Sequence, residues 1–163
     1  MQKLTFFLLL SLLFCCTYNW VGLSKPPFTE LSLGPIEGVQ EEPGLESTLK
    51  ESVKHYFRSK GINIKENAPL RLEGKIKEKK IDTIARDLSG LSRQVRVFLR
   101  VWFSLVKDEK SLWETELKRD KLLNLGDSPV LDQEKRKKIL SELCDDLTQE
   151  LYIRLILSLN SLK

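Results

Sequence analysis

The sequence predicts an α+β domain in which two helices pack on one face of a four-stranded sheet. The first observation is size and composition: 163 residues with 41% hydrophobic and 31% charged side chains are typical of one globular domain. The second is a change of hydrophobic period, from strand-like alternation to helical spacing, back to alternation, and finally to helical spacing. The order is therefore strand, helix, three strands, helix, and a two-layer sandwich is the simplest way to bury both helices.

The first strand and the first helix occupy residues 28–61. The strand begins at Phe28 and ends at Gly34-Pro35, or at Gly38 if the chain only kinks at the proline. The helix begins at Pro43, because proline is tolerated at a first helical position, and Gly61 ends it in the left-handed conformation. Its apolar face is formed by Leu45, Leu49, Val53 and Phe57.

Alternation then predicts three further strands. The first is half-buried, with apolar side chains at even-numbered positions up to Ile76. Residues 81–92 are expected to be a connection, and the strand over 93–106 follows with the clearest alternation in the chain. A polar turn at 107–110 leads to the last strand, over 111–118. The side chains expected to face the helices are Val95, Val97, Leu99, Val101, Phe103 and Leu105.

A long final helix is expected after a loop over 122–129. Asp132 is the predicted N-cap, because its carboxylate can accept a free backbone N–H at the positive end of the helix. Apolar residues then recur at four-residue spacing: Ile139, Leu143, Leu147, Leu151, Leu155 and Leu159. With both helices on one side, the other face of the sheet is left uncovered.

The chain before this domain has the layout of an export signal. Lys3 supplies a positive charge, and residues 4–14 are almost entirely apolar, within the length of a secretory signal core. Leu13 lies three positions before Cys16, which resembles a bacterial lipobox, and an acylated cysteine would hold the protein firmly on a membrane. The expected boundaries are 1–15 for a signal peptide, 16–27 for a lipidated N-terminus and linker, and 28–163 for a single domain.

An uncleaved anchor is the alternative interpretation of the same segment. Residues 4–23 are about long enough to span a bilayer as a helix. The protein would then be an exported, membrane-anchored domain that recognises a cell-envelope ligand. Thr17, Tyr18 and Asn19 interrupt the apolar run, which favours cleavage. Both interpretations place the domain outside the cytoplasm.

Composition and motifs give no indication of catalysis, metal binding or nucleic-acid binding. The formal net charge of +4 is far below that of a dedicated nucleic-acid-binding protein. The three cysteines match no zinc-ligand spacing, and no nucleophile motif surrounds His55, the only histidine. Cys144 lies on the apolar side of the last helix and is expected to be a small buried hydrophobe. We expect no catalytic residue, no metal and no cofactor.

Several strings, in this order along the chain, resemble the LptE family of lipopolysaccharide-assembly lipoproteins. They are Cys16-Thr17-Tyr18, Glu42-Pro43-Gly44-Leu45-Glu46, Ala68 with Leu72-Glu73-Gly74-Lys75-Ile76, Ser111-Leu112-Trp113, and Tyr152-Ile153-Arg154-Leu155. The resemblance implies an outer-membrane lipoprotein, lipid-anchored on the periplasmic face. Such a protein sits as a plug inside the β-barrel protein LptD, assists its assembly, and helps lipopolysaccharide to pass to the outer leaflet.

The uncovered face of the predicted sheet is the candidate binding site, because it combines cations with aromatic rings. Its residues are Lys75, Lys77, Arg96, Phe98, Arg100 and Trp102. Lipopolysaccharide presents phosphates above acyl chains, so these side chains could pair charged hydrogen bonds with apolar contact. The interpretation that we favour is a solvated or partner-covered face, such as a contact with the wall of an LptD-like barrel, where aromatic and arginine side chains carry binding energy.

Overall fold

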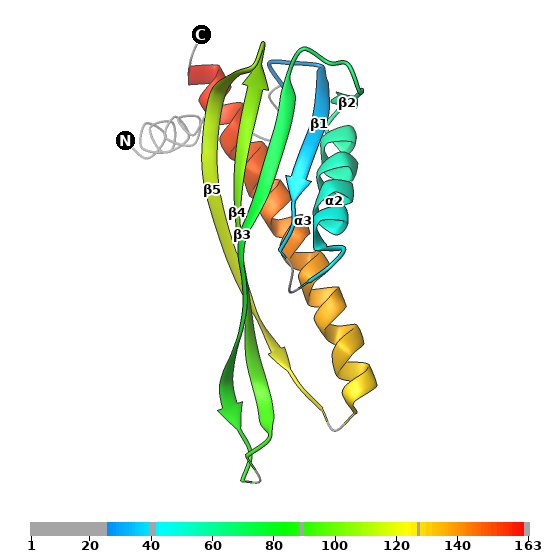
Figure 1. Cartoon of the computed structure of the whole chain (residues 1–163), viewed down its shortest axis with the longest axis vertical. Coiled ribbons are helices and arrows are strands. Elements are labelled where there is room, and N and C mark those ends of the chain that lie inside the picture. The colour runs from blue at the N-terminus through cyan, green and yellow to red at the C-terminus, as the bar shows by residue number, and fades with distance from the viewer. Residues whose placement is uncertain (1–25, 40–41, 89, 127, 162–163) are drawn as a thin grey trace, which may run out of the picture.

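The computed structural model describes residues 26–161 apart from 40–41, 89 and 127, and within them it contains two helices and five strands. Their bounds are β1 Glu30–Glu37, α2 Leu45–Ser59, β2 Asn63–Ile64, β3 Arg71–Arg86, β4 Ser92–Lys107, β5 Lys110–Asn124 and α3 Pro129–Ser161. The strands form one curled, mixed sheet in the order β2-β1-β3-β4-β5, with both helices on one side (Figure 1). The predicted α+β class is confirmed. Four strands is corrected to five, because the two residues of β2 are too few to show alternation.

β1 is parallel to both of its neighbours, whereas β3, β4 and β5 form an antiparallel meander. On its outer side β1 is paired with β2 only at Glu30 and Leu31. The strand continues past Pro35 to Glu37, as in the second of the two predicted ends, and its register shifts between Leu33 and Ile36. Such an irregularity accommodates a proline, which has no N–H to donate to a ladder.

The core lies between the helices and the meander. The odd-numbered side chains of β4, from Val95 to Leu105, are buried there as predicted. Helix side chains that pack in the same core are Leu49, Val53 and Phe57 of α2 and Leu143, Leu147, Leu151 and Leu155 of α3. Gly74 of β3 is paired with Phe103, and a Cβ at Gly74 would lie 3.3 Å from the phenyl ring. The ring therefore fills the space that a side chain at Gly74 would occupy.

Both helices begin at positions that differ from those predicted. α2 begins at Leu45 rather than at Pro43, because Gly44 has a φ of 91°, a left-handed conformation that glycine adopts without strain. α3 begins at Pro129, a favoured first position for proline. Asp132 is therefore in the first turn and is not the N-cap, although its Oδ1 accepts a hydrogen bond from the backbone N–H of Gly126 at 2.8 Å.

The largest correction concerns the hairpin of β3 and β4. Residues 81–92, predicted to be a connection, are mostly strand. The reason is a register shift after Ile76 that leaves Lys77 without a paired residue in β4. The extra residue reverses the alternation of β3, so that Lys79 lies opposite buried Leu99 and faces the helices. The alternation of apolar and polar residues is therefore interrupted at Lys77, although the strand continues to Arg86.

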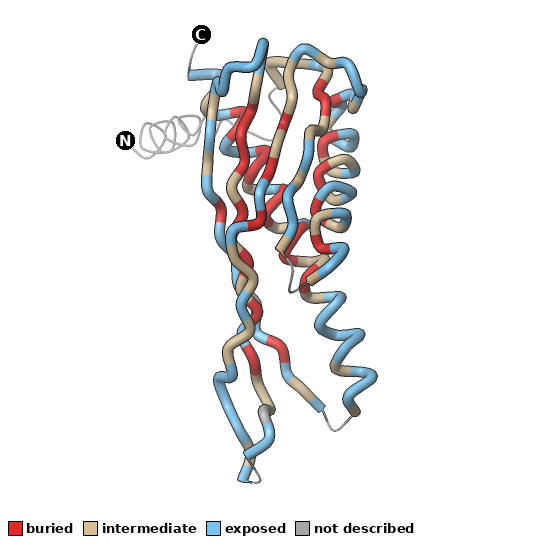
Figure 2. Tube along the Cα trace, viewed as in Figure 1, coloured by how far each residue is buried: buried red, intermediate tan, exposed pale blue. Residues whose placement is uncertain are grey.

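This continuation makes the hairpin longer than the layer of helices. β3 has 16 residues, about 50 Å of extended chain, and with β4 it projects past α2 to a free tip (Figure 1). β5 also runs on to Asn124 instead of ending at Lys118. The tip and the first turns of α3 are largely exposed (Figure 2), and Leu88 at the tip is fully exposed. The helices thus cover only part of the predicted inner face.

Ion pairs attach β5 to α3 at the edge of the sheet. Arg119 and Lys121 face the helix side of β5, where Arg119 is 2.6 Å from Glu150. The Lys121 Nζ lies 3.2 Å from Glu142 and 3.0 Å from Asp146. Burial alone would lower the pKa of Lys121, but its hydrogen bonds to Asp146 and Glu142 outweigh burial and raise the pKa. The edge strand is therefore held to α3 by charged side chains.

Thr148 of α3 offers a test of core packing. It is fully buried, and within the described residues its hydroxyl has no hydrogen-bond partner. We expect Thr148→Val to raise the free energy of unfolding by about 1 kcal/mol in urea denaturation, because an unsatisfied buried hydroxyl is destabilising. Thr115→Val is the matched control. The Thr115 hydroxyl accepts a hydrogen bond from Arg154, so its removal should not raise the free energy of unfolding. A less stable Thr148→Val protein would show that the hydroxyl is satisfied.

Candidate partner-binding face

The open face is the side of the sheet without helices, and it carries the predicted site residues. These are Lys75, Lys77, Arg96, Phe98, Arg100 and Trp102. Trp102 lies opposite Lys75, and Phe98 lies opposite Lys80. Lys77 is at the register shift, and its Nζ lies 5.8 Å from the centre of the Trp102 ring, within reach of a cation–π contact. The structure therefore brings the predicted cations and rings together on one surface.

Both arginines of the predicted site have acidic partners that the sequence analysis missed. Arg100 donates a hydrogen bond to Glu78 of β3 at 2.6 Å and lies 3.8 Å from Glu116 of β5. Arg96 lies 3.4 Å from Asp120 of β5. The acids of β5 could have been found by following its even-numbered positions, whereas Glu78 is hidden by the register shift. Much of the positive charge predicted for this face is compensated within the sheet.

Lys75 is also paired. Its ammonium group forms an ion pair with Glu37 at the end of β1. The hydrogen bond from Lys75 and its positive charge, together with the charge of Lys77, lower the pKa of the Glu37 carboxyl. The cluster around Trp102 therefore joins β1, β3 and β4. The indole of Trp102 is half-buried and lies beside Lys75, whose charge is neutralised by Glu37.

A shallow hollow of about 660 Å³ lies beside Phe98 on the open face. Five basic and four acidic side chains line it together with Phe98. Small-molecule pockets are usually enclosed and mostly apolar, which this surface is not. A broad, charge-balanced surface with half-buried aromatic rings fits the surface of another macromolecule better.

Other candidate chemistry in the described part of the chain is limited. No group of three or more residues there could hold a metal ion. Cys144 is fully buried, as predicted, and burial raises the pKa of its thiol to about 12. His55 lies exposed on α2.

Over the same described residues, neither helix has the length of apolar sequence that crossing a bilayer requires. The predicted signal peptide over 1–15 and Cys16 lie outside the described residues.

The fold is an α+β domain whose two helices lie on one side of a mixed sheet and leave the other, charge-balanced face open. The sequence model of the LptE family, described as lipopolysaccharide-assembly, matches residues 28–155. This match spans all the strands and most of α3, and the chain belongs to the LptE family. The family consists of non-enzymatic assembly lipoproteins.

Three solved bacterial structures have the same fold, and two of them are described as lipoproteins. A protein from Xanthomonas campestris has a TM-score of 0.62 at 11% identity, over 85% of this chain and 90% of that one. The rare lipoprotein B from Shewanella oneidensis has a TM-score of 0.58 at 13% identity, over 81% and 94%. A minor lipoprotein from Acinetobacter baumannii has a TM-score of 0.56 at 16% identity, over 79% and 90%. At these identities the likeness establishes the fold alone, and no curated protein sequence matches.

Proposed function

We propose that this protein is an outer-membrane lipoprotein on the periplasmic side that sits inside an LptD-type β-barrel. There it assists assembly of the barrel and helps lipopolysaccharide to pass to the outer leaflet. The observation that carries the proposal is the LptE family match over residues 28–155, which includes the whole sheet. In this process the domain acts by binding other molecules and not by catalysing a reaction.

The open face is the surface that we assign to the barrel. The inner wall of a membrane β-barrel is polar, so a plug needs a surface whose charges are already compensated or find partners there. Arg96 and Arg100 are compensated within the sheet. Phe98 and Trp102 are half-buried and supply the aromatic contact that often dominates binding energy. Direct contact with lipopolysaccharide phosphates would require Arg96 and Arg100 to leave their acidic partners.

The anchor is the second part of the proposal. Cys16 is the residue that we expect to be acylated after removal of residues 1–15, giving a tether to the inner leaflet of the outer membrane. Mass spectrometry of protein extracted from membranes should show the loss of fifteen residues and added acyl mass. A full-length, unmodified product would instead establish a retained N-terminal anchor.

Co-purification from detergent-solubilised membranes tests the role of the open face. We expect the wild-type protein to retain a large barrel protein, and the combined change Phe98→Ala and Trp102→Ala to weaken retention about a hundredfold or more, because buried aromatic anchors each contribute about 2 kcal/mol and every 1.4 kcal/mol is about tenfold. His55→Ala removes an exposed ring from the helix layer and is the control.

Three results of this experiment have separate meanings. Weaker retention by the open-face variant alone supports the assigned surface. Equal retention by both variants, with unchanged circular dichroism, would remove the open face from the interface. Absence of a barrel partner with the wild-type protein would overturn the proposed function itself.

A further inference from the structure

A groove lies between the projecting hairpin of β3 and β4 and the first turns of α3. It consists of two hollows, of about 570 and 210 Å³, and Gln133 and Arg136 line both of them. On α3 the groove extends from Pro129 to Leu140, about 17 Å along the helix axis. The opposite wall comes from the hairpin and is formed by Lys79, Ile81, Leu91, Arg93 and Val97. We call the two hollows together the hairpin groove.

The hairpin groove contains cations whose charge is not compensated. Its two acidic side chains already have partners, because Glu42 forms an ion pair with Lys79, and Asp132, only 14% exposed, accepts a backbone hydrogen bond at 2.8 Å. Arg136 and Lys137 form no ion pair within the part of the chain that the structure describes. The groove therefore has a net positive charge that a ligand can neutralise.

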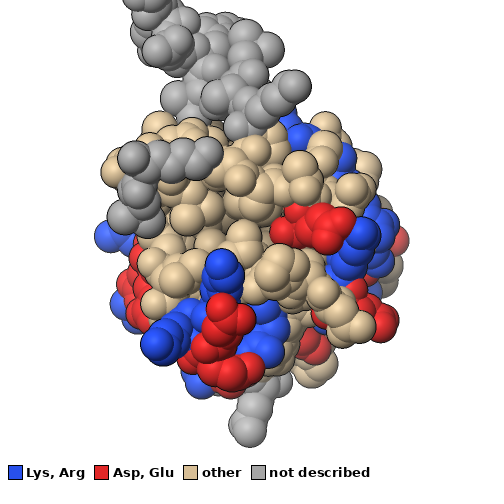
Figure 3. Space-filling view, turned by 90° about the horizontal axis from the view of Figure 1, so that it is seen from above, with Lys and Arg blue, Asp and Glu red and all other residues tan. Residues whose placement is uncertain are grey.

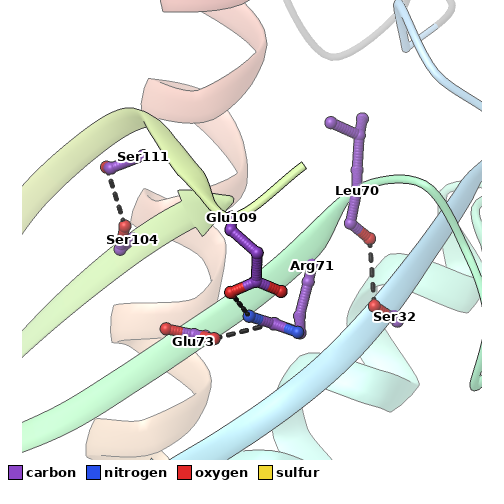
Figure 4. A network of polar contacts seen from close by, with 7 residues as sticks. All are labelled: Ser32, Leu70, Arg71, Glu73, Ser104, Glu109 and Ser111. Atoms are coloured by element: carbon purple, nitrogen blue, oxygen red, sulfur yellow. Dashed lines mark hydrogen bonds and ion pairs between the residues drawn. The ribbon is translucent and has the colours of Figure 1, made fainter. Parts of the chain in front are cut away.

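Charged side chains at the other end of the domain, around the turn over 107–110, are compensated instead. Figure 3 views the molecule from that end and shows acidic side chains directly beside basic ones. Arg71 lies 3.5 Å from Glu109 of the turn and 2.7 Å from Glu73 (Figure 4). The arginines of the open face also have acidic partners. Of these three surfaces, the hairpin groove offers an acidic ligand the most accessible positive charge.

The shape and composition of the groove favour an extended polypeptide as this ligand. Gln133 lies where the two hollows join, and its side-chain amide can both donate to and accept from a peptide group, whereas a phosphate would use only the donors. A length of about 17 Å accommodates about five extended residues. Apolar side chains line the groove on both sides of Gln133, with Leu91 and Pro129 toward the tip and Ile81 and Leu140 further in.

We propose that the hairpin groove binds an extended, acidic segment of the barrel partner, with carboxylates on Arg136 and Lys137 and a peptide group on Gln133. This inference rests on the proposed function, because it assumes a barrel partner, but it concerns a surface separate from the open face. The long loops and the polar interior of a membrane barrel are sources of such a segment. Since the contacts come from side chains, the segment adds no strand to the sheet.

Co-purification of the barrel partner with the full-length protein tests the charge contact. We expect Arg136→Glu to weaken retention about tenfold, because a hydrogen bond between charged groups is lost and replaced by repulsion. Lys138→Glu makes the same change of charge two positions along α3, but Lys138 lines neither hollow, so retention should change less than about twofold. Both side chains are exposed, and circular dichroism should show the same fold for both variants.

Photo-crosslinking from position 133 identifies the occupant. A benzoylphenylalanine replaces Gln133 in one full-length protein and Lys138 in the matched control, and cells are irradiated before detergent extraction. We expect an adduct with the barrel protein that is several-fold more abundant from position 133 than from position 138. Mass spectrometry of the adduct should place the crosslink in a segment rich in Asp and Glu.

The remaining outcomes separate this inference from the proposed function. An adduct of position 133 with lipopolysaccharide instead of protein would show that the groove holds the phosphates of the lipid, and would overturn the polypeptide occupant. Equal retention by Arg136→Glu and Lys138→Glu, with the barrel retained by the wild-type protein, would overturn the groove contact and leave the proposed function intact. Absence of a barrel partner with the wild-type protein would overturn both.

Discussion

Phe103→Ala is expected to lower the free energy of unfolding by about 3–5 kcal/mol, the range found when a buried phenyl ring is removed. Phe103 is fully buried in the middle of β4. Its neighbour across the ladder is Gly74, which has no side chain that could move into the cavity. The loss should therefore lie near the upper part of that range. Urea denaturation followed by circular dichroism measures it.

The same position allows a coupling experiment. In the wild-type protein a methyl group at Gly74 would be crowded by the Phe103 ring at 3.3 Å, so Gly74→Ala should be destabilising. In the Phe103→Ala protein that crowding is absent, and Gly74→Ala should be neutral or stabilising. Phe98→Ala, on the open face of the same strand, is the control and should cost about 1 kcal/mol or less. Additive effects of the Gly74 and Phe103 changes would contradict this description of the core.

Glu42→Gln is expected to be the second most damaging change, lowering stability by about 2 kcal/mol because it leaves a charged amine without its ion pair. Lys79 faces the helices as a result of the register shift, and its side chain is only 10% exposed in its pair with Glu42. Glu42 is 32% exposed, so water can solvate it when its partner is removed. Lys79→Met should therefore be close to neutral.

The asymmetry between these two variants is the measurement that matters. Glu51→Gln, which breaks the exposed pair with Lys54 on α2, is the control for loss of an acid and should change stability by less than about 0.5 kcal/mol. If Lys79→Met lowered the free energy of unfolding as much as Glu42→Gln, the ion pair itself would stabilise the fold. The loss in Glu42→Gln would then not be due to a buried lysine charge left without a partner.

The parts of the fold that the sequence predicted correctly are those with an unbroken pattern. The apolar face of β4, from Val95 to Leu105, and the leucine spacing of α3 identify the core directly. The extent of the hairpin was wrong, because one extra residue at Lys77 reverses the alternation and places a lysine on the inner face. β2 was missed because a parallel pairing of two residues has no pattern of its own.

The candidate site was predicted as a set of residues but not as an electrostatic environment. Period two correctly placed Phe98 and Trp102 on the face opposite the core. It did not show that Arg100 lies between Glu78 and Glu116, since those contacts depend on how three strands are aligned. Register arises from tertiary pairing, and alternation within one strand does not determine it.

Under the proposed function, the two edges of the sheet affect how the domain can approach an unfinished barrel. A barrel under assembly has strands that still lack neighbours, and an ordinary sheet edge would pair with them. Here β2 pairs with β1 only at Glu30 and Leu31, and Pro35 lies in β1 beyond this pairing. Arg119 and Lys121 face the helix side of the other edge strand, β5, where an added strand would bury them further. On the proposed function, the domain could then lie beside unpaired strands of the barrel without adding to its sheet.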